Sequence, residues 1–138
     1  ELGATGTVLP RWELAAGFGT QVARITDSTA AAPAGRRVPL VPRTQWSLWN
    51  KVGVTRAAAV GLGVIRQGDM FAAIDNAVRL PAFTRVDAAL YYTLTRAFRA
   101  QLNVENLLDT RYFATSHGNN NIMPGTPRLV RLTLVTGR

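Results

Sequence analysis

The side chains that could perform chemistry in this sequence are few and far apart. The one histidine, His117, lies in a stretch rich in glycine and asparagine. A catalytic or metal-binding histidine needs a partner such as a carboxylate. Of the eight acidic residues, only Asp69 and Asp75 share a predicted loop, and no histidine accompanies them. Cysteine is absent, which excludes disulfides and zinc–thiolate sites. We therefore expect no enzyme, no metal site and no cofactor.

The charge of the chain suggests a binding function before it suggests a catalytic one. The formal net charge is +8, and almost all of the excess is arginine, since Lys51 is the only lysine. Such a balance raises nucleic acid as a partner. A nucleic-acid surface clusters its charge on one face, whereas these arginines are scattered and Arg36-Arg37 is the only adjacent pair. Nucleic acid is not the expected partner; a basic nucleic-acid-binding domain stays a third hypothesis, which predicts binding that weakens steeply with salt.

Period-two alternation of apolar and polar residues predicts an all-β chain. In the clearest segment, 84–95, Val86 and Leu90 share one face while Arg85 and Asp87 share the other. The other predicted strands are 12–23, 43–54, 57–66, 99–108 and 128–136, and residues 1–7 form the end of a further strand. A short helix over 57–66 is the alternative there, but its glycines disfavour it. The pattern predicts an antiparallel meander of about six to seven long strands.

Strand length and loop length together favour a membrane-spanning sheet. The predicted strands have about 9 to 12 residues, which suits a tilted strand crossing a bilayer. Tight turns (near 8–11, 55–56 and 95–98) alternate with long connections (24–42, 67–82 and 109–124). Outer-membrane barrels keep short turns on one side and long loops on the other. A soluble sheet would also bury its apolar face, so a small soluble β-barrel or interaction domain remains the alternative.

Four ordered motifs add a family resemblance. They are "RVPLVPRTQWSLW" (37–49), "RLPAFTRVDAALYY" (79–92), "NVENLLDTRYFA" (103–114) and "PGTPRLVRLTL" (124–134). In this order they resemble the last strands of TonB-dependent outer-membrane receptors, most closely those for ferric siderophores. The third motif is similar to the run that ends the penultimate strand of the family and opens its last extracellular loop.

The resemblance implies a location, a function and a set of partners. Residues 1–138 would be the C-terminal part of a 22-stranded transmembrane β-barrel in a Gram-negative outer membrane. The plug domain and most of the barrel would be absent, so the chain would be inactive alone. The partners of the full receptor would be a ferric siderophore, the TonB complex, outer-membrane lipid and the barrel-assembly machinery. The family usually ends on an aromatic residue, whereas this chain ends at Thr136-Gly137-Arg138, which leaves its assembly in question.

The resemblance also implies where ligand would be contacted. Siderophores present aromatic or hydroxamate groups and often negative charge, which arginine and aromatic side chains bind. The candidates in the extracellular loops and upper lumen are Arg36, Arg37, Arg66, Phe71, Arg79, Tyr112, Phe113 and His117. The glycines of 17–19 and 61–63 would make room for the plug.

The last two motifs are expected to have a structural role. Their residues are Asn106, Asp109, Arg111, Tyr112, Pro124, Gly125, Pro127 and Arg128. Asn106 and Asp109 would hydrogen-bond the backbone where the strand leaves the sheet. Asp109 and Arg111 would hold the turn by their opposite charges. Residues 114–123 would then form an irregular loop, and Pro124 and Pro127 would restart an extended chain.

Overall fold

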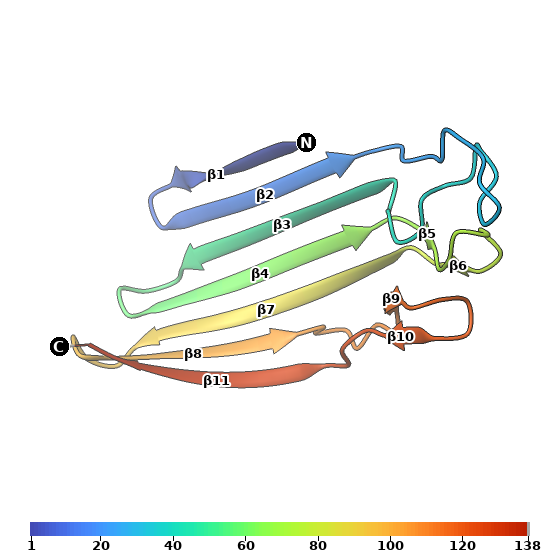
Figure 1. Ribbon diagram of the computed structural model, residues 1–138. Helices are drawn as coiled ribbons and strands as arrows, with labels where there is room; N and C mark the ends of the chain where they lie inside the picture. The colour runs from blue at the N-terminus through green and yellow to red at the C-terminus, as the bar shows by residue number, and fades with distance from the viewer. Residues whose placement is uncertain (138) are drawn as a thin grey trace.

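The structure is a computed structural model that describes residues 1–137. Its long strands are β1 (Leu2–Leu9), β2 (Trp12–Thr20), β3 (Thr44–Gly53), β4 (Ala58–Gln67), β7 (Phe83–Thr93), β8 (Phe98–Glu105) and β11 (Leu129–Thr136). The short strands are β5 (Met70–Phe71), β6 (Arg79–Leu80), β9 (Phe113–Ser116) and β10 (Ile122–Pro124). The long strands form one antiparallel sheet in chain order (Figure 1), which confirms the predicted meander. Within the described range, no helix has the length and apolarity to cross a membrane.

The sheet is open, and its two ends differ. β1 and β11 are its edge strands, so these seven strands do not close into a small barrel. Figure 1 shows the three tight turns at one end of the sheet and the three long connections at the other. Two of the tight turns have the same construction: Thr55 Oγ1 accepts from the N–H of Ala58 (2.9 Å), and Thr95 Oγ1 accepts from that of Phe98 (3.1 Å). The predicted alternation of loop lengths is thus confirmed.

Two strands, β2 and β8, end three residues earlier than predicted. β2 ends at Thr20 and not at residue 23, because the backbone beyond it bonds to the returning loop: Val38 N–H donates to Ala23 O (3.1 Å). β8 ends at Glu105 and not at residue 108, because Asn106 takes a left-handed conformation (φ 52°) that a strand does not continue.

The long connections contain two short hairpins, and the second takes the place of the irregular loop predicted for 114–123. β5 pairs with β6, and β9 pairs with β10, where Ile122 faces Ser116. The second hairpin turns through Gly118, whose φ of 140° suits glycine. Each short strand spans only a few residues, too few for an alternating pattern to be recognised in the sequence.

Strand pairing places apolar residues of all seven long strands on one face. Leu90 pairs with Leu102, and Leu102 pairs with Leu132. Large side chains of this face are well exposed; on β11, Leu132 is 64% exposed and Leu134 is 67% exposed. An apolar surface extending over seven strands far exceeds what a soluble domain leaves in water. This face, hereafter the apolar face, therefore meets lipid.

The apolar face contains one polar exception in its interior, and that residue has a partner. Asn50 on β3 lies between Leu14 of β2 and Leu62 of β4. The indole Nε1 of Trp12 donates a hydrogen bond to Asn50 Oδ1 (3.1 Å). The bond satisfies the carbonyl oxygen, which is expensive to bury in hydrocarbon without a donor.

The opposite face, hereafter the polar face, is held by ion pairs. Glu13 pairs with Lys51 between β2 and β3 (3.1 Å), and Arg131 pairs with Glu105 between β11 and β8 (3.3 Å). Lys51 also lies 5.3 Å from the centre of the Tyr91 ring, a cation–π contact. Charged side chains line the interior of a membrane barrel and not its lipid surface, so the polar face is the inner wall.

Two glycines of the polar face accommodate a tryptophan. The Trp49 indole on β3 lies over Gly61 and Gly63 of β4. A Cβ on Gly61 would lie 2.6 Å from Trp49 Cζ2, and one on Gly63 would overlap the same ring. A side chain of the same sheet therefore lies directly against these glycines, and the predicted room for a plug at 61–63 stays a prediction.

The assignment of the faces predicts the effect of one matched pair of substitutions. Leu102 and Gln101 are neighbours on β8 but lie on the apolar and polar faces respectively. Leu102→Lys should lower the free energy of unfolding by about 2–4 kcal/mol, since it places a charge in lipid near mid-bilayer. Gln101→Lys should change it little. Urea unfolding of the full-length protein in vesicles measures both, and equal effects would refute the assignment of the faces.

Candidate functional site

The long connections bring arginines and an aromatic ring together around Asp69. Arg37 Nη1 lies 2.9 Å from Asp69 Oδ2, and Arg79 Nε lies 2.9 Å from the same oxygen. Arg37 Nη2 also donates to the Asp69 backbone oxygen (2.9 Å). The Arg37 guanidinium lies over the Phe71 ring, 5.1 Å from its centre. Three of the predicted ligand residues, Arg37, Phe71 and Arg79, are thus neighbours in the structure.

This group, hereafter the Asp69 cluster, has two guanidinium groups for one carboxylate. The hydrogen bond from Arg79, joined by that from Arg37, lowers the pKa of Asp69 below 3.8, although burial opposes the shift. The carboxylate therefore stays ionised at neutral pH and orients both arginines. Arg79 remains 65% exposed at its side chain, so the cluster presents positive charge to solvent.

The lowered pKa predicts how the cluster responds to pH. A carboxylate whose pKa is lower in the folded than in the unfolded protein stabilises the fold. This contribution is complete above the pKa of the unfolded protein, about 3.8, and is lost as pH falls through the pKa of the folded protein. Asp69→Asn should therefore lower the heat-modification midpoint, the temperature at which half of the folded protein unfolds and shifts on a gel, at pH 7. The difference from wild type should shrink as pH falls below about 3.8 and vanish below the lowered pKa of Asp69. Asp27→Asn, in a neighbouring connection, is the control. A difference that persists at the lowest pH would contradict the ion-pair account.

The connection 68–82 links the other two long connections. On one side, Leu40 N–H donates to Phe71 O (2.9 Å). On the other, Ser116 Oγ donates to Ala72 O (2.8 Å). Met70, Ala72 and Leu80 form the main hydrophobic cluster, with Val78 and Ile122 packed against it. The three connections therefore form one packed cap over that end of the sheet.

Asn106 organises the departure of the chain from β8. Its side chain is fully buried and accepts from Thr110 N–H (2.9 Å), while its Nδ2 donates to Thr110 O and Thr126 O (3.0 Å each). Its own N–H donates to Asp87 Oδ1 (2.8 Å). Every polar group of this buried side chain is thus bonded, as burial requires. Asn106 joins β7, the turn after β8 and the start of β11.

Asp109 hydrogen-bonds the backbone, as predicted, but it does not pair with Arg111. Its Oδ1 accepts from the backbone N–H of Arg128 (2.9 Å), and among the described residues it forms no ion pair with Arg111. The left-handed turn at Asp109 (φ 51°) turns the carboxylate toward the returning strand. Asp109 therefore joins the two motifs at 103–114 and 124–134.

Tyr112 packs against the inner wall next to this turn. Its ring stacks on Phe83, with centroids 4.1 Å apart, and its hydroxyl accepts from Arg85 Nη1 (3.3 Å). Arg85 in turn pairs with Asp87 (2.8 Å). Gly125 lies against the ring, where a Cβ would overlap it. A cavity of about 600 Å³ lies beside the stack, lined by 81–83, 109–113, Pro124, Gly125 and Pro127.

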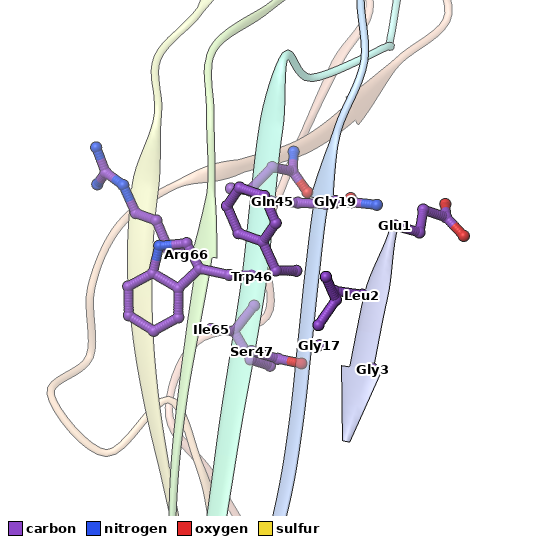
Figure 2. A pocket seen from close by; sticks show the side chains of 12 residues that line it. Glu1, Leu2, Gly3, Gly17, Gly19, Gln45, Trp46, Ser47, Ile65 and Arg66 are labelled. Atoms are coloured by element: carbon purple, nitrogen blue, oxygen red, sulfur yellow. The ribbon is translucent and has the colours of Figure 1, made fainter. Parts of the chain in front are cut away.

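A second hollow crosses β1 to β4 near the long connections, with a volume of about 490 Å³ (Figure 2). Gly3, Gly17 and Gly19 line it together with Gln45 and Ser47. Strand pairing places these five residues on the polar face, so the hollow is a shallow depression in the inner wall. It lies at 17–19, where the sequence predicts room for another part of the receptor, and that role stays a prediction.

The other four predicted ligand residues are dispersed. Arg66 lies on the apolar face, where it pairs with Trp46 and Thr84. Phe113 begins β9 and lines the 600 Å³ cavity. His117 lies at the tip of the β9–β10 hairpin, where its N–H donates to Asn121 O (2.8 Å). Arg36 lies beside Arg37, and its carbonyl oxygen accepts from Ile25 N–H (2.9 Å).

Two residues of the site were missed from the sequence. Asp69 has no histidine partner, but it pairs with Arg79 of its own connection and with Arg37 of the connection 21–43, which lies 32 residues away. Asp87 was assigned to a strand face, but it bonds Asn106 and Arg85. The signal for Asp87 was present in "RVDAALYY", because an acid in the middle of a membrane strand requires a partner.

Comparison with known proteins identifies the family. The model of the family described as TonB dependent receptor-like, beta-barrel, matches residues 1–107. Over 96% of its length the chain is 34% identical to the catecholate siderophore receptor Fiu of Escherichia coli K12, and it covers 18% of that protein. It is 29% identical, over 96% of its length, to the probable TonB-dependent receptor BfrD of Bordetella pertussis, covering 19% of it.

Solved structures of such receptors have the same fold as this chain. The crystal structure of Fiu from E. coli K12 in its closed form superimposes with a TM-score of 0.86, at 30% identity, over 97% of this chain and 20% of that one. The receptor PiuA of Acinetobacter baumannii superimposes with a TM-score of 0.85 at 23% identity, over 96% of this chain and 20% of that one, and shares the fold. The chain spans about a fifth of these proteins. It belongs to the TonB-dependent receptors, and its long strands are a segment of their outer-membrane β-barrel.

Proposed function

We propose that this chain is the C-terminal part of the barrel of a receptor that imports a ferric siderophore of the catecholate class. In this proposal the TonB complex supplies the energy, the barrel-assembly machinery inserts the receptor, and these residues alone do not transport. The Asp69 cluster carries the proposal, because it presents arginines and an aromatic ring on the extracellular side. The similarity to a catecholate siderophore receptor over 96% of the chain supports the ligand class.

The charge of the extracellular end fits such a ligand. The connections 21–43, 68–82 and 106–128 contain seven arginines and four aspartates. A ferric catecholate complex is anionic and has aromatic rings, so guanidinium groups attract its charge and aromatic side chains stack on its rings. Arg79, which is largely exposed, is the best placed to contact it, and Phe71 lies close by.

The location of the native polypeptide tests the first half of the proposal. An antibody against 114–123 should detect an outer-membrane protein far larger than the 14.9 kDa of this chain. Heating the sample before electrophoresis should shift the band, as expected when a barrel unfolds. A soluble band of 14.9 kDa would contradict the proposal and favour an independent β-domain.

Uptake of a radiolabelled ferric catecholate tests the second half. Arg79→Gln in the full receptor should raise the apparent KM about tenfold, because one charge-assisted contact is lost, while the amount of receptor in the outer membrane stays constant. Arg24→Gln, which changes the charge equally in another connection, is the control. Unchanged uptake by Arg79→Gln would refute the role of the Asp69 cluster, and no uptake by the wild type would refute the ligand class.

A further inference from the structure

Arg66 is the one charged residue among the described strand positions of the apolar face. It is the penultimate residue of β4, at the end with the long connections, and it pairs with Trp46 on β3 and Thr84 on β7. Figure 2 shows Trp46 and Arg66 projecting to the same side of the sheet. A cation is costly at mid-bilayer but costs little near the interface. Because long loops of such barrels are extracellular, Arg66 lies at the head-group level of the outer leaflet.

The Arg66 guanidinium has hydrogen-bonding capacity that the protein does not use. Its Nη1 donates to Thr84 Oγ1 (3.0 Å), and a guanidinium has five N–H donors in all. Within residues 1–137 no carboxylate forms an ion pair with it, and the nearby Asp69 is held by Arg37 and Arg79. The charge therefore needs an anion from outside the chain or water.

The surroundings of Arg66 suit an amphiphilic partner. On one side Trp46 and, beyond it, Phe18 form an aromatic row, with exposures of 37% and 48%. Toward mid-bilayer the next row is Leu48, Val64 and Val86, which pair across β3, β4 and β7. A cation at head-group level, an interfacial aromatic row and an apolar track below it match the head group and acyl chains of one anionic lipid.

We propose that Arg66, together with Trp46, binds a phosphate of lipid A, the phosphorylated glycolipid of the outer leaflet of Gram-negative outer membranes. The planar guanidinium can hold a phosphate through two parallel hydrogen bonds, which a lysine cannot reproduce. Thr84 holds the guanidinium in place from the other side. The inference rests on the outer-membrane location of the barrel and not on the imported ligand, so failure of the siderophore proposal leaves it intact.

Reconstitution into vesicles of defined composition tests the proposal. The full receptor, wild type or Arg66→Gln, is placed in phosphatidylcholine vesicles with or without bisphosphorylated lipid A, and the heat-modification midpoint and the bound lipid A are measured. Lipid A should raise the midpoint of the wild type. Arg66→Gln should bind it about tenfold more weakly and lose most of the rise. Arg66→Lys should keep part of the rise, because the positive charge remains but the two parallel hydrogen bonds of the guanidinium are lost.

Three controls make each outcome decisive. Arg24→Gln removes the same charge from a loop and should respond to lipid A as the wild type does. Arg66→Gln should match the wild type in phosphatidylcholine alone, which separates lipid binding from misfolding. Dephosphorylated lipid A and phosphatidylglycerol should both fail to reproduce the rise. An equal rise with either lipid, or a full response of Arg66→Gln to lipid A, would overturn the proposal.

Discussion

Replacing Asn106 with leucine should lower the free energy of unfolding of the receptor by about 4 kcal/mol or more. The substitution removes the side-chain bonds to Thr110 and Thr126, so three backbone groups next to this fully buried side chain lose their partners. Each such group costs about 1–3 kcal/mol where water does not replace the lost partner. Leucine would also have to adopt the left-handed conformation at φ 52°, which asparagine tolerates better than most residues.

A graded series separates these causes. Asn106→Gly keeps the backbone conformation but loses the three bonds, whereas Asn106→Asp keeps the acceptor for Thr110 N–H and loses both donor contacts. The expected order of stability is wild type, then Asp, Gly and Leu. The exposed Asn120 serves as the control, and Asn120→Leu should have little effect. Urea unfolding in vesicles gives the values, and a near-neutral Asn106→Leu would refute the account of this network.

The second large effect is expected at Gly125, where alanine should cost about 3 kcal/mol. The new methyl group would overlap the Tyr112 ring, and the ring would have to move. The movement breaks the stack on Phe83 and the hydrogen bond from Arg85. The wall of the 600 Å³ cavity would shift with the ring.

A double-mutant cycle shows whether Tyr112 is the cause. In a Tyr112→Ala background, Gly125→Ala should cost little, so the two changes should couple by at least about 1 kcal/mol. Gly6→Ala is the matched control, because a Cβ at Gly6 meets no atom within 4 Å. Strict additivity of Gly125→Ala and Tyr112→Ala would mean that the strain arises elsewhere.

The long strands could be predicted because lipid and the inner wall impose opposite requirements on alternate residues. Val86, Ala88 and Leu90 repeat with a period of two along β7, and tight turns fix three of the strand pairs: β1 with β2, β3 with β4 and β7 with β8. The hairpins β5–β6 and β9–β10 could not be predicted in this way. They are held by Met70, Leu80 and Ile122, which pack across connections distant in sequence.

The candidate site was predictable in composition but not in arrangement. Arginine and aromatic side chains indicated an anionic, aromatic ligand, and Arg37, Phe71 and Arg79 do meet. Their meeting depends on Asp69, whose partners are 32 and 10 residues away. Arg66 does not join them, because its register on β4 places it on the apolar face and not in the upper lumen.

The position of Trp49 over two glycines has a consequence for how the sheet finds its register during assembly. A slip of one residue between β3 and β4 would turn Lys51 toward lipid, at a cost of up to about 2–4 kcal/mol. The bilayer therefore disfavours a slip by any odd number of residues. A slip of two residues keeps every side chain on its own face, so lipid does not oppose it. It would, however, move the Trp49 ring over Ala59 or Ile65, whose side chains occupy the space that Gly61 and Gly63 leave empty. Lipid and one tryptophan together leave a single alignment for these two strands.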